Sequence, residues 1–178
     1  DTRAEFIDKQ LASAGWSTGG DVRVQREYNI NAGEIKAGGI RTGKLIADYV
    51  LSYKNRKLAV VEAKSNELEV GEGVAQAKLY GEKLHLETSY AANGNEIYQI
   101  CHKTGEEGLV EKFPTPEELW NKTFAEPNEW LEKFNAVPFE DLNGTKQARY
   151  YQELAVNKVM AAIAKGKDRA LLTLATGT

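Results

Sequence analysis

The sequence has few of the residues on which common covalent and metal chemistries depend. Its 178 residues include one cysteine, Cys101, and two histidines, His85 and His102. A single cysteine excludes an intramolecular disulfide and fits a reducing, cytoplasmic setting. The two histidines lie far apart in the sequence and there is only one cysteine, which argues against a zinc site and against a Ser-His or Cys-His nucleophile. Any catalysis is therefore expected to depend on carboxylates and lysines.

Long apolar runs are also missing, so the sequence predicts neither a transmembrane helix nor a signal peptide, and no membrane partner. The net charge of −3 argues on its face against nucleic-acid binding. The charge is unevenly spread, however: by count, residues 1–64 carry 11 basic and 8 acidic side chains, whereas residues 65–138 carry 6 and 14. The first segment is therefore mildly basic, which weakens that argument.

Proline is scarce and clustered, because all four prolines lie between residues 114 and 138. Such a cluster indicates a connector with short helices. We therefore divide the chain into a mixed α/β domain over residues 1–113, a helical connector over 114–143 and a further segment over 144–178. Within the connector, Thr115 and Glu118 form a capping-box pattern at a helix start.

The α/β domain is predicted to have a mixed central sheet flanked by helices. Segments rich in β-formers predict the strands, and helical spacing of apolar residues predicts a first helix that ends at Gly15. The predicted strands cover residues 22–28, 46–53, 58–64, 89–92, 96–102 and 109–113, with a second helix over 73–86. Further along, residues 145–165 predict a long helix and the apolar run 170–174 a buried parallel strand.

Two carboxylates and a lysine are expected at one end of the hairpin formed by strands 46–53 and 58–64. If the hairpin is symmetric about Asn55, Asp48 lies opposite Glu62, with Cβ atoms about 4.5–5.5 Å apart. Lys64 is two residues after Glu62 and shares its face. Two close oxygen anions suit Mg²⁺, and the lysine can act on a water or a phosphate, so the pattern fits metal-assisted phosphodiester hydrolysis. A structural ion pair near a strand end is the alternative.

These residues resemble a known nuclease signature. Asp48, followed after 13 residues by Glu62-Ala63-Lys64, resembles the PD-(D/E)xK motif, with Ala47 in place of its proline. The resemblance implies a restriction-endonuclease-like fold, in which Asp48, Glu62 and the Ala63 carbonyl hold Mg²⁺ and Lys64 acts on the water or the scissile phosphate. The superfamily often has a further acidic residue on its first helix, and Glu5 is the best candidate.

A second motif makes the resemblance more specific. Gln76 and Tyr80 are four residues apart on one helical face. Together with the 60–64 string Val-Val-Glu-Ala-Lys, they resemble the N-terminal nuclease domain of HsdR, the restriction subunit of type I restriction-modification enzymes. In this family a Gln-x-x-x-Tyr motif follows the lysine. The two side chains are expected either to contact DNA or to brace the active site.

The end of the chain resembles the start of a superfamily 2 helicase motor, which follows the nuclease domain in HsdR subunits. Arg149 and Gln152 match the Q motif, whose glutamine binds the adenine edge of ATP, and Thr176, Gly177 and Thr178 match the beginning of motif I. The resemblance implies the first helix and strand of a RecA-like domain. Because the phosphate-binding Lys and the Mg²⁺-binding Ser/Thr are not in the sequence, ATP is expected in the full-length motor rather than here.

Three functions remain open at this point. The leading hypothesis is a Mg²⁺-dependent endonuclease that cuts double-stranded DNA in the cytoplasm of a bacterium or archaeon, in a complex with methylation and specificity subunits. The alternative is a non-catalytic, nuclease-like module that binds DNA or a partner in front of a helicase-type ATPase. A third possibility is an ATPase whose front domain is only an adaptor.

Overall fold

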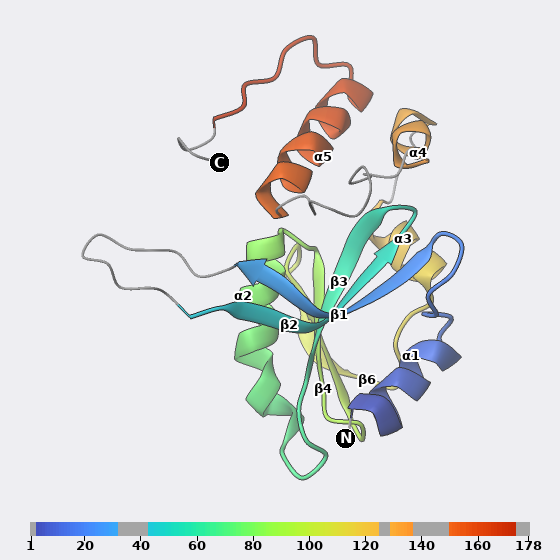
Figure 1. Ribbon diagram of the computed structural model, residues 1–178, viewed down its shortest axis with the longest axis vertical. Helices are drawn as coiled ribbons and strands as arrows, with labels where there is room; N and C mark the ends of the chain where they lie inside the picture. The colour runs from blue at the N-terminus through green and yellow to red at the C-terminus, as the bar shows by residue number, and fades with distance from the viewer. Residues whose placement is uncertain (1–2, 32–42, 125–128, 137–149, 174–178) are drawn as a thin grey trace, which may run out of the picture. The chain divides into compact units, whose positions relative to one another are not determined.

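The computed structural model has two compact units, Asp1–Ala125 and Glu126–Thr178. The residues that it describes are 3–31, 43–124, 129–136 and 150–173. The first unit is an α/β domain whose sheet lies between helices (Figure 1). This unit extends beyond the predicted boundary at residue 113, because helix α3 (Pro116–Thr123) buries Leu119 and Trp120 in the core of the sheet.

A mixed six-stranded sheet forms the centre of this domain, with the strands in the order β1-β2-β3-β4-β5-β6. β3 and β4 are parallel, and all other neighbours are antiparallel. The predicted mixed α/β fold is thus confirmed, although the last strand begins earlier than predicted. The strands are β1 (Val22–Asn31), β2 (Leu45–Tyr53), β3 (Arg56–Ala63), β4 (Thr88–Ala92), β5 (Ile97–Cys101) and β6 (Glu107–Val110).

The two faces of the sheet carry different helices. On one face, Tyr49 and Val61 pack with residues of the N-terminal helices η1 (Arg3–Ile7) and α1 (Asp8–Ser13). On the other face, α2 (Val74–Leu84), preceded by the 3₁₀ helix η2 (Val70–Gly73), covers β3 and β4. Since successive strand residues point to opposite faces, Asp48 and Glu62 lie on the α2 face.

The β2–β3 hairpin sets the register of the predicted site. Lys54 and Asn55 have φ angles of 48° and 59°, so the turn has two residues, both in the left-handed region. Tyr53 pairs with Arg56, one residue earlier than a turn symmetric about Asn55 would give. A register shift between Leu51 and Ser52 then accommodates one extra residue of β3.

Beyond this irregularity the pairing is the predicted one, since Tyr49 lies opposite Val61. Asp48 and Glu62 are the next residues along the same two strands and lie on the same side of this pair, so this register places them opposite each other. The turn was therefore predicted wrongly and the register at the site correctly.

The capping box predicted before α3 is present. The Thr115 hydroxyl accepts a hydrogen bond from the Glu118 backbone N–H at 3.2 Å, and the Glu118 carboxylate accepts one from the Thr115 N–H at 2.8 Å. These bonds satisfy two amides that a helix start leaves open. They fix the start of α3 after Thr115, and with this start Leu119 and Trp120 are buried in the core.

The second unit contains α4 (Glu129–Asn135) and α5 (Tyr150–Ala164), which agrees with the predicted long helix over the residues described. Residues 170–173 do not form the predicted buried strand: they have no regular structure, and Leu171 is 89% exposed. A parallel strand needs a neighbour for its hydrogen bonds, and the described part of this unit has no strand. Gln152 lies exposed on α5, whereas Arg149, Thr176, Gly177 and Thr178 lie outside the described residues.

Within the described ranges, no helix is both long enough and apolar enough to cross a membrane.

The core contains one polar atom whose removal should not weaken the fold. Tyr90 is fully buried against Phe113, and its hydroxyl has no hydrogen-bond partner. We expect Tyr90→Phe to leave the free energy of unfolding unchanged or to raise it by up to about 1 kcal/mol, because an unsatisfied buried hydroxyl is lost and the ring is kept. Urea denaturation measures this change.

Tyr49→Phe is the matched control, since Tyr49 is equally buried but its hydroxyl donates to Asp8 Oδ1 at 2.9 Å. This variant should lose about 1.5–3 kcal/mol, the usual range for a hydrogen bond to a charged group. Equal losses of unfolding free energy in both variants would contradict the inference that the Tyr90 hydroxyl has no hydrogen-bond partner.

Candidate active site

Asp48 is held against the end of the neighbouring strand. It is half-buried in β2, between the fully buried Ala47 and Tyr49. The backbone N–H of Ala63 donates to Asp48 Oδ2 at 2.8 Å. This bond joins the Asp48 carboxylate to the residue between Glu62 and Lys64, so the three predicted catalytic side chains converge at one end of β3.

Glu62 is a buried carboxylate that the protein satisfies only in part. The residue is 5% exposed, and its Oε1 accepts a hydrogen bond from Lys64 Nζ at 3.0 Å. Its Oε2 is buried with no hydrogen-bond partner. Burial raises the pKa of Glu62 above the ordinary value of 4.5; the Lys64 hydrogen bond opposes this shift, and the nearby Asp48 carboxylate adds to it. Two acidic side chains thus share a desolvated site with one ammonium group.

Lys64 is the first residue after β3, and bonds at both its backbone and its side chain hold it. Its N–H donates to the Ala92 carbonyl of β4 at 2.8 Å. Its ammonium group also donates to Gln76 Oε1 on α2, and Gln76 Nε2 lies 3.4 Å from the Tyr80 hydroxyl. Of the two roles predicted for Gln76 and Tyr80, these contacts support bracing of the lysine.

Gly73 lets α2 come close to this site. A Cβ atom at this position would lie 3.2 Å from Ala91 Cβ, 3.3 Å from Lys64 Cγ and 3.5 Å from Glu62 Cγ. The first two distances are tighter than ordinary van der Waals contact. The start of α2 therefore packs directly on the side chains of Lys64 and Glu62. Gly73 was not among the predicted site residues; its only signal in the sequence is a glycine at the beginning of a predicted helix.

The donor set fits a hard divalent cation. The Asp48 carboxylate and the unpartnered Glu62 Oε2 are oxygen ligands of the kind that Mg²⁺ prefers, and a cation beside them would offset the burial of charge. Glu5 is exposed on η1. Among the described residues no three His, Cys, Asp or Glu side chains are grouped closely enough to hold a metal, so the structure does not bring Glu5 to this pair.

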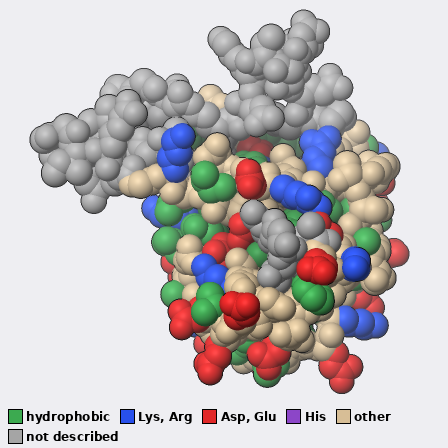
Figure 2. Space-filling view, turned by 60° about the horizontal axis from the view of Figure 1, so that its bottom comes forward, with side chains coloured by type: hydrophobic (Ala, Val, Ile, Leu, Met, Phe, Trp, Pro, Cys, Tyr) green, Lys and Arg blue, Asp and Glu red, His purple; other side chains and the backbone are tan. Residues whose placement is uncertain are grey.

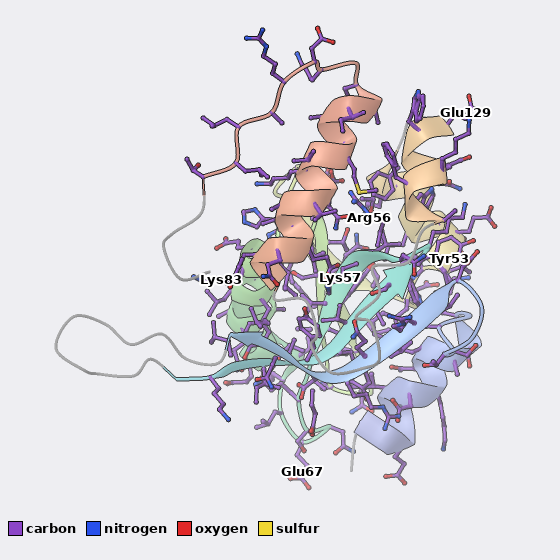
Figure 3. The ribbon with its side chains drawn as sticks, turned by 45° about the horizontal axis from the view of Figure 1, so that its top comes forward. Tyr53, Arg56, Lys57, Glu67, Lys83 and Glu129 are labelled. Carbon is purple, nitrogen blue, oxygen red and sulfur yellow. The ribbon has the colours of Figure 1, made fainter. Side chains whose placement is uncertain are left out.

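The other acidic side chains nearby are on the surface. Glu67, Glu69 and Glu72 are exposed in and after the turn that follows Lys64. Figure 3 labels Glu67 at this end of β3, opposite the hairpin end marked by Tyr53 and Arg56. Figure 2 shows acidic and basic side chains of the described residues intermixed on one face of the molecule.

Comparison with known proteins identifies the family. A family model for the second domain of the type I restriction enzyme EcoKI endonuclease subunit matches residues 16–116. The chain is 33% identical over 195 residues to the type I restriction enzyme EcoAI endonuclease subunit of Escherichia coli and 29% identical over 228 residues to the EcoKI endonuclease subunit of E. coli strain K12. The matches cover 99% and 97% of this chain but 24% and 20% of those subunits.

A solved structure agrees with this result. It is described as a fragment of an HsdR subunit of a type I restriction enzyme from Vibrio vulnificus YJ016, and it matches with a TM-score of 0.78 and 34% identity. The match covers 100% of this chain and 35% of that one. The chain therefore belongs to the family of type I restriction enzyme endonuclease subunits, as its motifs predicted, and corresponds to the N-terminal region of an HsdR subunit.

Proposed function

We propose that this chain contains the PD-(D/E)xK-type nuclease domain of a type I restriction subunit and that, within the full-length subunit, this domain cleaves double-stranded DNA with Mg²⁺; the chain by itself is not expected to be active. The observation that carries the proposal is the buried Glu62 Oε2, which has no hydrogen-bond partner and lies in a site shared with Asp48 and Lys64. A structural ion pair accounts for Oε1, which accepts from Lys64, but not for the second, buried oxygen that has no partner.

The residues have distinct roles in this proposal. Asp48 and Glu62, with the Ala63 carbonyl, hold the metal. When bound, Mg²⁺ supplies Lewis-acid stabilisation of charge on the phosphate oxygens and lowers the pKa of a bound water. Lys64, held by Glu62 and Gln76, presents its ammonium group to the attacking water or to the scissile phosphate, where it stabilises developing negative charge.

The proposal extends to the complete subunit. Because the chain spans a quarter or less of its curated relatives, we propose that the rest includes the ATP-dependent DNA translocase. Gln152 and Arg149, with Thr176, Gly177 and Thr178, would then begin its ATP site. We further propose that the subunit works with methylation and specificity subunits and acts with them on double-stranded DNA.

A metal titration tests the proposed site. Mg²⁺ or Mn²⁺ is expected to raise the melting temperature of the wild-type chain, since a cation that binds only the folded state stabilises it by about 2.7 kcal/mol at a hundredfold excess over Kd. Asp48→Asn should remove this stabilisation, while its side-chain oxygen can still accept the Ala63 N–H. Differential scanning calorimetry with and without the cation measures both effects.

Glu67→Gln is the matched control, because it removes an exposed carboxylate outside the site and should keep the full response to metal. A non-catalytic module predicts no metal response that depends on Asp48. Equal stabilisation of the wild type and Asp48→Asn would therefore reject this site.

A further inference from the structure

The β4–β5 turn contains a buried asparagine whose contacts lead to the candidate active site. Asn93 directly follows β4 and is 4% exposed. Its Oδ1 accepts hydrogen bonds from the backbone N–H groups of Asn95 at 3.1 Å and Glu96 at 2.8 Å, which closes the turn. Its Nδ2 donates in the other direction, to the Leu68 carbonyl at 2.8 Å. One amide group therefore joins two separate turns.

The second turn is the segment that follows the catalytic lysine. At the start of this segment, the Lys64 N–H donates to the Ala92 carbonyl. Within the segment, the Leu68 N–H donates to the Ser65 carbonyl at 3.1 Å. The bond from Asn93 Nδ2 to the Leu68 carbonyl holds its other end. The adjacent residues Ala92 and Asn93 thus attach both ends of the Lys64–Leu68 segment to β4.

This segment also leads into the helix that braces the lysine. Two residues after Leu68 the chain enters η2, whose last residue, Gly73, packs on Lys64 and Glu62. α2 follows at once and carries Gln76, which accepts from the Lys64 ammonium group. The position of Leu68 therefore affects Lys64 in two ways. The backbone from Lys64 to Leu68 connects the two residues directly, and the helices η2 and α2, which follow Leu68, carry Gly73 and Gln76 back to the Lys64 side chain.

We propose that Asn93 is a positioning residue for DNA cleavage: by holding the Leu68 carbonyl, it keeps the ammonium group of Lys64 between Glu62 and Gln76. This inference rests on the proposed nuclease function. Asn93 touches neither the scissile phosphate nor the metal in this scheme. Asp48 and Glu62 are held by β2 and β3, so their hold on the cation does not depend on this bond.

Asn93→Asp is a selective probe of this bond. The carboxylate keeps an oxygen for the two turn amides, but its second oxygen replaces Nδ2 and repels the Leu68 carbonyl. In the full-length subunit assembled with its partner subunits, we expect kcat for DNA cleavage to fall about 10- to 100-fold, because misplacement of a catalytic group by about 1 Å has an effect of this size. The KM for DNA, the Mg²⁺ concentration for half-maximal rate, ATP hydrolysis and translocation should be unchanged.

Asn95→Asp is the matched control for added charge. It places a carboxylate two residues away and removes only a 3.3 Å bond from Asn95 Nδ2 to the Asn66 carbonyl at an exposed position. Cleavage by this variant should stay within about threefold of the wild type, as expected for a weak surface bond. Asn93→Ser keeps an oxygen for the turn amides, removes Nδ2 and adds no charge. Its single, shorter hydroxyl does not span both turns, so this variant should reproduce the fall in kcat.

A double-mutant cycle separates positioning from a general loss of structure. If Asn93 acts through Lys64, adding Asn93→Asp to Lys64→Ala should not lower the residual cleavage further, because residues that act through one another are non-additive. A full additional loss in that background would overturn the proposal. So would wild-type kcat in both Asn93→Asp and Asn93→Ser, or a higher Mg²⁺ requirement. Wild-type cleavage by Lys64→Ala itself would instead reject the proposed nuclease site, and this inference with it.

Discussion

Glu62→Gln is expected to abolish DNA cleavage and at the same time to stabilise the protein in the absence of metal. Glutamine keeps the size of the side chain and an oxygen for the Lys64 ammonium group, but it removes a negative charge from a site where Glu62 Oε2 has no partner. The variant should therefore fold with the same core. It should bind metal poorly, and cleavage by the assembled full-length enzyme should fall by roughly a thousandfold or more.

The gain in stability follows from the direction of the pKa shift. Because burial raises the pKa of Glu62 above 4.5, the folded state binds this proton more tightly than the unfolded state does. The group thus stabilises the fold below pH 4.5, and this contribution is lost as the pH rises through the folded pKa. At neutral pH the buried charge destabilises the protein, and Glu62→Gln should raise the free energy of unfolding by about 1 kcal/mol, the usual size of such a trade-off.

Urea denaturation at pH 4 and pH 7 in the presence of EDTA measures this effect. The gain should be present at pH 7 and should shrink at pH 4, where the wild-type carboxyl group is largely protonated. Glu69→Gln, which changes an exposed carboxylate near the site, is the control and should alter neither stability nor cleavage. A loss of stability in Glu62→Gln at pH 7 without metal would show that the charge contributes to the fold rather than to metal binding.

Lys64→Ala is expected to reduce cleavage about as strongly, by roughly a thousandfold, while DNA translocation and ATP hydrolysis by the full-length subunit continue. The ammonium group is the only cation that the described contacts place on Glu62, and its loss leaves two carboxylates facing each other. The variant removes the charge that stabilises the phosphate in the transition state, so kcat should fall more than KM changes.

Gln76→Ala provides a graded test of the same assignment. Lys64 keeps its bond to Glu62 but loses its acceptor on α2, so kcat should fall by about 10- to 100-fold. Lys103→Ala removes an exposed lysine in the β5–β6 turn and is the control for a change of charge. Single-turnover cleavage measurements distinguish these variants. Undiminished cleavage by Lys64→Ala would reject the catalytic role of the lysine.

The convergence of Asp48, Glu62 and Lys64 could be predicted because a strand has a period of two residues. A shift of one residue would turn Asp48 into the core of Tyr49 and Val61, so burial strongly specifies the register. This constraint explains why the register at the site was predicted correctly although the turn was not. The irregularity between Leu51 and Ser52 absorbs the difference between a two-residue turn and the pairing that the core requires.

The predicted strand over residues 170–174 shows the limit of local patterns. An apolar run indicates that residues can be buried, but a parallel strand forms only when another strand supplies its hydrogen bonds. The part of the second unit that is described has two helices and no strand, and Leu171 and Leu172 are exposed. Glu5 is a similar case. An acidic side chain on the first helix could have been a third metal ligand, but the described part of the chain does not bring it to Asp48 and Glu62.

The sequence by itself determined the family, the strands and helices that carry the motifs, and the pairing of two carboxylates with a lysine. These features depend on local periodicity and on which side chains can be buried. Only the tertiary structure decided that Gln76 reaches Lys64, that Gly73 packs on Glu62 and that Asn93 holds the turn between them. Those contacts depend on the crossover that brings β4 beside β3 and lays α2 across them, and the spacing of residues along the chain does not encode the distances between elements that meet in this way.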